Sequence, residues 1–275
     1  MLKQPNREDI ETCQNNGKTI VLSIGGEKGV PGLTSFASAE EAKKNAYTIW
    51  QMFGPLASES PAAKDRPFGK SAVNGFDLDI EDPDIEYLPE WAKEMRTLTK
   101  SQHILLTAAV DCGNLPGEGP MGKLISSNVT LDYVNIQFYN SMNCWESGEN
   151  NSEIKKDVID AWNDWATTKN AQWLVGLAAG DSACKVTGCY KDDMTLFNEP
   201  KKSSQFGGAM LWDMSQAVNN QNFEKKVKNA LTQEGDPVSM SSQVMSTTSS
   251  LLTVPTTTTT FSGTQNDSSQ ISSHT

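Results

Sequence analysis

The sequence predicts an α/β fold in which short strands alternate with helices along a parallel sheet. The chain has 275 residues, enough for one large α/β domain or two small ones. Short apolar runs of strand length recur between segments whose apolar residues have helical spacing. In one such run, at residues 74–81, three acidic side chains alternate strictly with three large apolar ones. Strands and helices that alternate in this way form parallel sheets with helical crossovers.

The first third of the chain supplies three of these elements. Residues 6–16 are expected to end a helix, with Gly17 as its cap. The apolar run Thr19–Ser23 is a strand that ends in Gly25-Gly26, where glycine permits a tight turn or close approach to a ligand; for the glycines alone, a plain turn is the simpler interpretation. Residues 39–53 are a helix because apolar side chains recur on one face.

The remaining elements continue the alternation. Residues 133–138 are a strand because three apolar side chains alternate with Asn135 and Gln137. Trp162 and Trp165 lie three residues apart in one helix and are expected in the core. After the strand at 74–81 we expect strands at 104–109, 133–138, 173–177 and 209–212, and helices at 88–100, 154–168, 194–204 and 223–232.

The alternating stretch at residues 74–81 is the most informative part of the chain. Its three acids, Asp77, Asp79 and Glu81, lie on one face of a strand in a column about 13 Å long. Acids stacked in this way repel one another, so some must hold protons or find hydrogen-bond donors. A solvated acidic edge strand is one alternative. A calcium loop is another, disfavoured by the bulky intervening residues and the missing glycine. A catalytic column is favoured because strained ionisable clusters concentrate at active sites.

Composition excludes several functional classes. There are 34 acidic against 23 basic residues, and the net charge of −11 argues against nucleic acid or an anionic membrane as partner. A neutral or weakly cationic polymer fits better. No apolar run approaches membrane-spanning length. With only His103 and His274 available, a general acid or base is expected from carboxylates, and neither a metal nor a cofactor is expected.

The last part of the chain has a different composition. Of the final 38 residues, 21 are Ser or Thr, including five consecutive threonines at 256–260. Such a segment cannot bury enough apolar surface to fold. We therefore expect a domain at residues 1–235, followed by a Ser/Thr-rich, disordered segment at 236–275. That segment is either an O-glycosylated stalk or a plain disordered terminus.

Five segments together resemble a known family. Asn74-Gly75-Phe76-Asp77-Leu78-Asp79-Ile80-Glu81 resembles the active-site strand of glycoside hydrolase family 18, the chitinases, whose usual form is Asp-Gly-x-Asp-x-Asp-x-Glu. The first position is Asn74 instead of Asp. The resemblance covers about residues 7–232 and is closest to the plant and fungal class III type. Four further segments follow the family's order: residues 21–26 (Ser-x-Gly-Gly), 106–109, 137–140 and 208–212.

The resemblance implies a TIM (β/α)8-type barrel, of which this chain holds six strands out of eight. The family's first two strands, first helix and secretory leader would precede residue 1. Cys13 would then pair with a cysteine in that segment. The implied setting is extracellular or cell wall, and the implied state is a monomer.

The resemblance also implies roles for individual residues. Glu81, at the strand end, would be the general acid, and the substrate's own acetamide would be the nucleophile. Asp79 would orient that acetamide and share a proton with Asp77, while Tyr139 would donate its hydroxyl to the acetamide oxygen. Trp212 would be the hydrophobic floor under the sugar. The other expected substrate-binding residues are Gln137, Asn140, Gly25 and Gly26. Singly, Tyr139 and Trp212 could equally be packing residues.

Five cysteines leave at least one without a partner in the chain. By resemblance, Cys112 and Cys144 correspond to a family disulfide. Cys184 and Cys189 enclose four residues and could close a loop. Both pairings assume an oxidising, secreted setting.

Three functions remain open. The first is an endo-acting chitinase that cleaves β-1,4-linked N-acetylglucosamine in chitin or chito-oligosaccharides. The second is a non-catalytic carbohydrate-binding member of the family, which would commonly lack the acid that Glu81 supplies. The third is an endo-β-N-acetylglucosaminidase acting on glycoproteins. The presence of Glu81, Asp79 and Tyr139 favours the first.

Overall fold

The computed structural model describes residues 7–27, 35–56, 66–100, 102–115, 117–148 and 152–232. All of them lie in the first of the two units into which the chain divides, Met1–Val238 and Ser239–Thr275. The expected domain boundary at 235 and the Ser/Thr-rich segment 236–275 lie outside the described residues. No helix in the described part of the chain is both long and apolar enough to cross a membrane.

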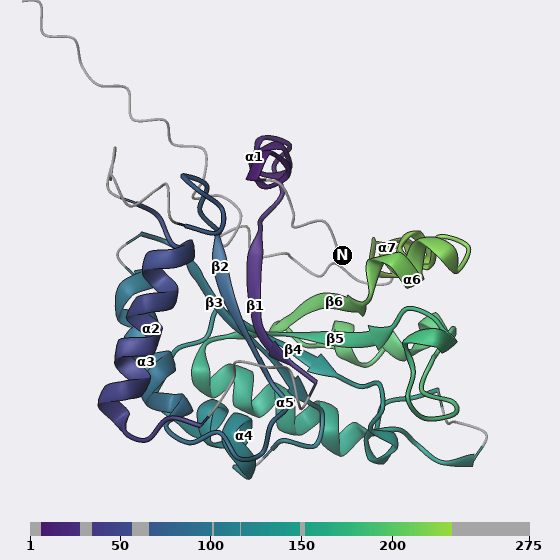
Figure 1. Cartoon of the computed structure of the whole chain (residues 1–275). Coiled ribbons are helices and arrows are strands. Elements are labelled where there is room, and N and C mark those ends of the chain that lie inside the picture. Colours follow the sequence, from purple (N-terminus) through teal and green to yellow (C-terminus); the bar gives the residue numbers. More distant parts are fainter. Residues whose placement is uncertain are drawn as a thin grey trace, which may run out of the picture. The chain divides into compact units, whose positions relative to one another are not determined.

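The described residues form one curved sheet of six parallel strands that follow one another in chain order (Figure 1). Each strand pairs with the next, and β1 and β6 are the two edges. This confirms the expected parallel α/β class and an arc of a barrel. The strands are β1 (Val21–Gly26), β2 (Gly75–Ile80), β3 (Leu105–Asp111), β4 (Tyr133–Gln137), β5 (Gln172–Ala178) and β6 (Phe206–Trp212).

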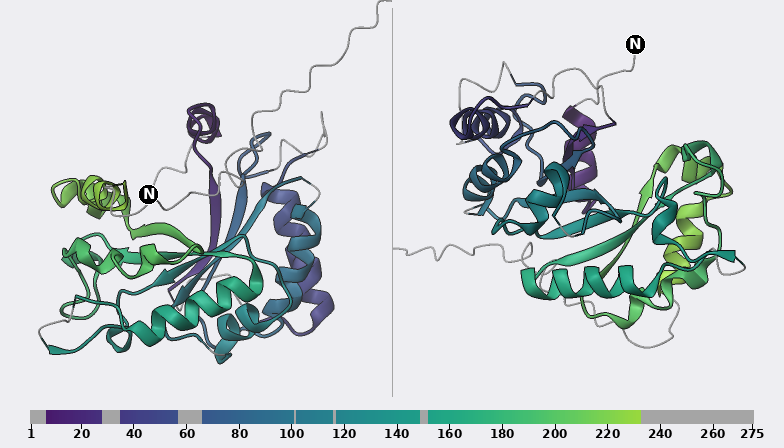
Figure 2. Two further views of the ribbon diagram at one scale, coloured as in Figure 1. Left: turned by 180° about the vertical axis from the view of Figure 1, so that it is seen from behind. Right: turned by 90° about the horizontal axis from the view of Figure 1, so that it is seen from below.

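Helices α2 to α5 connect successive strands from β1 to β5 and cover the outer face of the sheet, while α1 precedes β1 and α6 and α7 follow β6 (Figures 1 and 2). The N-cap of α2 is Ser38, whose side chain accepts a hydrogen bond from the Glu41 N–H. The N-cap of α6 is Asp213, which caps the Gln216 N–H in the same way. The helices are α1 (Arg7–Asn15), α2 (Ala39–Phe53), α3 (Leu88–Lys100), α4 (Gly119–Ser126), α5 (Lys156–Lys169), α6 (Met214–Asn219) and α7 (Phe223–Thr232).

The helix expected at 194–204 is wrong. Two short 3-10 helices occupy this segment, Met194–Phe197 and Pro200–Lys202. Pro200 has no backbone N–H and cannot continue an α-helical ladder, which accounts for the break. Helices α4 and α6 were not expected, because α4 contains two glycines and a proline and α6 has only six residues.

Two strand boundaries also differ from the expectation. Strand β1 begins at Val21 and runs through Gly26, because Gly25 and Gly26 continue the pairing with β2. Strand β6 begins three residues earlier than expected, at Phe206. The glycine pair is therefore part of an edge strand and not only a turn after it.

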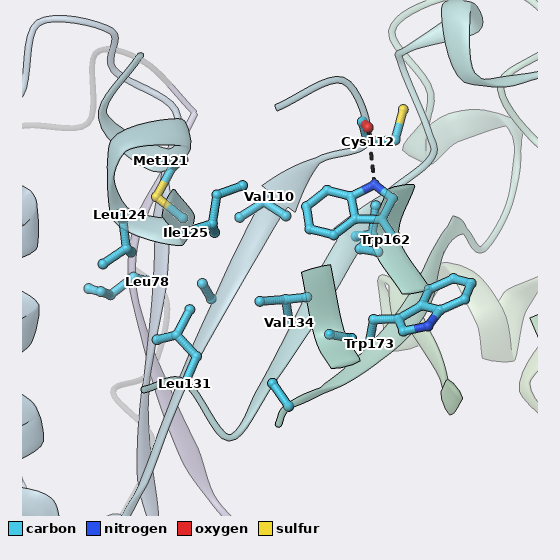
Figure 3. Close-up of a cluster of buried hydrophobic side chains, with 14 of the residues drawn as sticks. Leu78, Val110, Cys112, Met121, Leu124, Ile125, Leu131, Val134, Trp162 and Trp173 are labelled. Carbon is cyan, nitrogen blue, oxygen red and sulfur yellow. Dashed lines mark hydrogen bonds between the residues drawn. The ribbon is translucent and has the colours of Figure 1, made fainter. Parts of the chain in front are cut away.

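The hydrophobic core lies between the outer face of the sheet and the helices. Figure 3 shows Leu78 of β2 and Val134 of β4 in one cluster with Trp162 of α5. Trp162 is fully buried, and its indole N–H donates to the Cys112 carbonyl at 3.2 Å. Trp165 is 9% exposed and donates to the Ile125 carbonyl at 2.8 Å. The expectation that both tryptophans are core residues is confirmed.

Candidate active site

Asp77 is the deepest of the three acids. It pairs in register with Ser23 of β1 and Thr107 of β3, and side chains at paired positions of a parallel sheet share one face. Ser23 and Thr107 donate their hydroxyls to the two carboxylate oxygens of Asp77 at 2.8 and 2.6 Å. Asn135 of β4 donates more weakly at 3.5 Å. Burial raises the pKa of Asp77, and these three hydrogen bonds oppose that rise.

Asp79 lies one pleat nearer the C-terminal end of the sheet. The Gln137 amide donates to its Oδ1 at 2.8 Å. Burial, and then the negative charges of Glu81 and Asp77, raise the pKa of Asp79 to about 7, against the opposing effect of Gln137. Near neutral pH, Asp79 therefore exists in both protonation states. The charge of Asp77 acts on Asp79, while the hydrogen bonds described for Asp77 run to Ser23, Thr107 and Asn135. The proton predicted to be shared by Asp77 and Asp79 stays a prediction.

Tyr139 follows β4 and is buried beside the acids, with 8% of its surface exposed. Burial, and then the charges of Asp79, Glu81 and Asp77, raise the pKa of Tyr139. Its hydroxyl is therefore a proton-bearing donor throughout the ordinary pH range. The strand alternation that places Asn135 and Gln137 on the inner face also places Tyr139 there.

Glu81 is the first residue after β2 and is exposed. Its charge raises the pKa of Asp79, Tyr139 and Lys185, so it lies within electrostatic reach of all three. C-terminal strand ends are where barrel enzymes build their sites. The position of Glu81 at the mouth of the site is consistent with the general-acid role predicted for it.

The glycine pair of β1 has two distinct surroundings. Gly25 pairs with Asp79, has φ of +112°, and a Cβ there would lie 2.1 Å from the Asp79 carbonyl oxygen. Only glycine fits at this point, where β1 and the acid-bearing strand approach most closely. Gly26 also has positive φ, but a Cβ there would meet open space. Gly26 pairs in register with Ile80, a core residue, so the role predicted for Gly26 in substrate binding stays a prediction.

Asn140 and Trp212 stand apart from the acid column. The backbone of Asn140 has the left-handed conformation, with φ of 62°. Its side-chain Oδ1 accepts a hydrogen bond from the Lys185 backbone N–H at 2.8 Å. One end of its amide is therefore occupied by the protein itself. Trp212 ends β6, two strands beyond β4, and is 51% exposed at the edge of the sheet. The roles predicted for both in substrate binding stay predictions.

Two disulfides brace this end of the sheet. Cys112–Cys144 joins the turn after β3 to the short helix after β4, with a Cα–Cα distance of 6.3 Å. Cys184–Cys189 closes the loop after β5, with a Cα–Cα distance of 5.8 Å. Both expected pairings are confirmed. Cys13 on α1 is exposed and is not disulfide-bonded among the described residues.

Several partners of the acids were not singled out from the sequence. Ser23, Thr107 and Asn135 surround Asp77, and the signal that could have found them is their inward position in the strand alternation. Glu27 and Lys185, which form an ion pair near Glu81, have no such local signal. No group of three or more His, Cys, Asp or Glu side chains in the described ranges is arranged to hold a metal ion.

Known proteins resemble this chain over most of its length. Endochitinase 33 of Trichoderma harzianum is 36% identical over 240 residues, 84% of this chain and 72% of that protein. A class III chitinase of Arthroderma benhamiae is 38% identical over 239 residues, 82% of this chain and 69% of that protein. The crystal structure of ICChI chitinase from Ipomoea carnea superposes with a TM-score of 0.65 at 26% identity, over 82% of this chain and 78% of that one. The family model of glycosyl hydrolases family 18 matches residues 3–188. The chain therefore belongs to glycosyl hydrolase family 18.

Proposed function

We propose that this protein is an endo-acting chitinase that hydrolyses β-1,4 linkages between N-acetylglucosamine units with retention of the anomeric configuration. The observation that carries the proposal is Asp79, which is largely buried, bound to Gln137, and has a pKa of about 7 set by burial and its acidic neighbours. A carboxyl group poised between two protonation states beside a buried tyrosine suits acid–base chemistry on a neutral sugar.

The first step breaks the glycosidic bond. Glu81 gives its proton to the glycosidic oxygen, which leaves with the bonding electron pair. The acetamide oxygen of the sugar attacks the anomeric carbon from the opposite face and forms a cyclic oxazolinium ion. The ring carries the positive charge, so a nearby carboxylate lowers the barrier. Asp79 accepts the acetamide N–H and supplies that negative charge.

The second step returns the site to its starting state. The carboxylate of Glu81 takes a proton from water, and the hydroxide formed opens the oxazolinium at the anomeric carbon. Two inversions leave the product with the original β configuration. Tyr139 holds the acetamide oxygen through its hydroxyl, and its raised pKa keeps that proton in place. Asp77, held by the hydroxyls of Ser23 and Thr107, shares one proton with Asp79.

The remaining predicted residues have supporting roles. Gln137 orients Asp79 and lines the same subsite. The exposed indole of Trp212 provides an apolar floor for a sugar ring. Asn140 offers the amide end that the Lys185 N–H does not occupy. Gly25 lets β1 approach the backbone of Asp79, and Gly26 adds no side chain where β1 ends.

The two alternative functions are less well supported. A non-catalytic carbohydrate-binding protein would have no need for an exposed acid at Glu81 above a buried carboxyl with a pKa near neutrality. An endo-β-N-acetylglucosaminidase would use the same chemistry on a glycoprotein. Two relatives carry chitinase names, one of them as an endochitinase, which favours chitin as substrate and internal cleavage. We further propose that the protein is a monomer. It would act outside the cell or in the cell wall, in wall remodelling or chitin degradation.

The test is the configuration of fresh product from a chito-oligosaccharide, followed by NMR before mutarotation. The β anomer should be in initial excess. An initial excess of the α anomer would rule out the double inversion. Equal turnover of a substrate lacking the N-acetyl group beside the scissile bond would rule out the acetamide as nucleophile.

Glu81→Gln is the matched variant for this test. It should lower hydrolysis by at least about a hundredfold while oligosaccharide binding persists, because the amide keeps the shape but cannot give a proton. Glu86→Gln, at an exposed glutamate five residues further on, is the control and should retain activity. Hydrolysis that falls equally in both variants would remove the general-acid role from Glu81.

A further inference from the structure

An ion pair joins two segments at the C-terminal end of the sheet that are not neighbours in it. The Lys185 ammonium lies 2.9 Å from the Glu27 carboxylate. Glu27 directly follows β1, and Lys185 lies in the loop after β5. Strands β2, β3 and β4 separate these two strands in the sheet. The pair therefore bridges across the strand ends from which Glu81 and Tyr139 emerge.

Lys185 and Glu81 both lie at the C-terminal end of the sheet, Lys185 in the loop after β5 and Glu81 directly after β2. The pKa of Lys185 is raised, first by the hydrogen bond with Glu27 and further by the charges of Glu27 and Glu81. Lys185 thus places a cation at the same end of the sheet as Glu81, the proposed general acid. None of the roles assigned so far uses this cation.

The loop that carries Lys185 is held in place at its backbone. The neighbouring Cys184 forms the disulfide with Cys189. The Lys185 N–H donates to Asn140, which directly follows Tyr139. The backbone position is thus set by the disulfide and by β4, while the side chain is 55% exposed and can change its partner.

The present partner of Lys185 is easily exchanged. The Glu27 side chain is 67% exposed, and ion pairs between exposed side chains contribute little to stability. A bound sugar would offer the ammonium new hydrogen-bond acceptors, while the exposed Glu27 carboxylate would be solvated by water after Lys185 leaves it.

We propose that Lys185 is a substrate-binding residue, which releases Glu27 and donates to a hydroxyl or acetamide oxygen of the sugar bound beside Glu81. Glu27 is then a competitor for Lys185 that occupies it in the free protein. This inference rests on the proposed function, because the ligand is the same oligosaccharide. The two residues of one ion pair should therefore have opposite effects on binding.

Calorimetric titration with a tetramer of N-acetylglucosamine tests whether Lys185 binds substrate. The full chain carries Glu81→Gln, so that the ligand is not cleaved. Adding Lys185→Met should weaken the affinity for the tetramer about tenfold, because one hydrogen bond from a charged group is lost. Lys185→Arg, which keeps the charge, should restore most of it. Glu27→Gln should leave binding equal or tighter, because it releases Lys185 from its competitor.

Lys226→Met is the matched control, since Lys226 forms a comparable exposed ion pair with Asp192 at 2.7 Å. It should leave binding unchanged. If Lys185→Met and Glu27→Gln weaken binding alike, the pair is only a structural brace and the inference is overturned. Unchanged binding in Lys185→Met overturns it too. Absence of any binding to the Glu81→Gln protein would overturn the proposed function, and this inference with it.

Discussion

Asp79 shows how one side chain acquires properties that its residue type alone does not have. Its strand position places it on the inner face, burial raises its pKa, and Glu81 and Asp77 raise it further. Gln137 provides the one hydrogen bond described for its carboxyl group. The reactivity proposed for the site therefore depends on surroundings assembled from β2 and β4.

The raised pKa of Asp79 makes protein stability depend on pH. Below about pH 4 both the folded and the unfolded chain hold the Asp79 proton, and this contribution is fully present. Between about pH 4 and 7 only the folded chain keeps it, so the free energy of unfolding falls as pH rises, by about 1.4 kcal/mol per unit for one proton. Asp79→Asn should reduce this slope, as measured by urea unfolding across that range.

Asp164→Asn, at an exposed aspartate of α5, is the control for this measurement and should keep the slope of the unaltered chain. The Asp79→Asn chain should also be the more stable of the two at about pH 8, where the charged Asp79 is costly to bury. Parallel slopes in the two variants would contradict the assignment of the titration to Asp79.

At the scale of elements, the ends of neighbouring strands are joined by covalent and polar links. Cys112–Cys144 connects the segments after β3 and β4. Close by, the Ser141 hydroxyl donates to Asp111, the last residue of β3, at 3.1 Å. These links limit the movement of the β4 end, which carries Gln137 and Tyr139. A mobile strand end would lose the geometry that the chemistry needs.

The two disulfides should differ in how much they stabilise the protein. Cys112–Cys144 spans 32 residues and Cys184–Cys189 spans five. Loop-closure entropy then favours the longer bridge by about 1.5 kcal/mol. Replacing both members of a pair by alanine, and measuring chemical unfolding, should show the larger loss for Cys112–Cys144. An equal or larger loss at Cys184–Cys189 would mean that chain entropy does not set the contribution of these bridges.

At the scale of the whole described sheet, the edges are its weakest feature. Strands β1 and β6 are only partly buried along most of their length, whereas β3, β4 and β5 are mainly buried. A closed barrel has no edges, while this sheet has an unpaired one on each side. Packing beside the acids therefore depends on what covers those two strands.

A chimera tests the importance of these edges. The family resemblance assigns two strands and an intervening helix ahead of this region. When this segment of a class III relative is fused before Met1, its strands should pair with β1 and β6. The melting temperature should rise by about 2–4 °C for each kcal/mol gained, and hydrolysis should increase. A glycine–serine extension of equal length is the control. Equal melting and turnover in the two fusions would show that the open edges cost nothing.

Much of the fold and the centre of the site follow from the sequence alone. The parallel α/β class, the six strands and the acid column are local patterns, because a strand reveals itself by its own alternation. The Cys112–Cys144 disulfide was predicted from the family resemblance, and the Cys184–Cys189 disulfide from the short spacing of its two cysteines. The segment at 194–204 was predicted as one helix, whereas Pro200 divides it into two short 3-10 helices.

Only the tertiary structure decided which side chains surround the acids. Ser23, Thr107 and Asn135 lie 54, 30 and 58 residues from Asp77, and their convergence depends on strand register. The pairing of Glu27 with Lys185 depends on the paths of two loops across the strand ends. The same holds for the pKa of Asp79, which is set by burial and by charges that the fold brings near it. The alternation of a strand can be predicted from neighbouring residues, but contacts between strands form only when the whole sheet has folded.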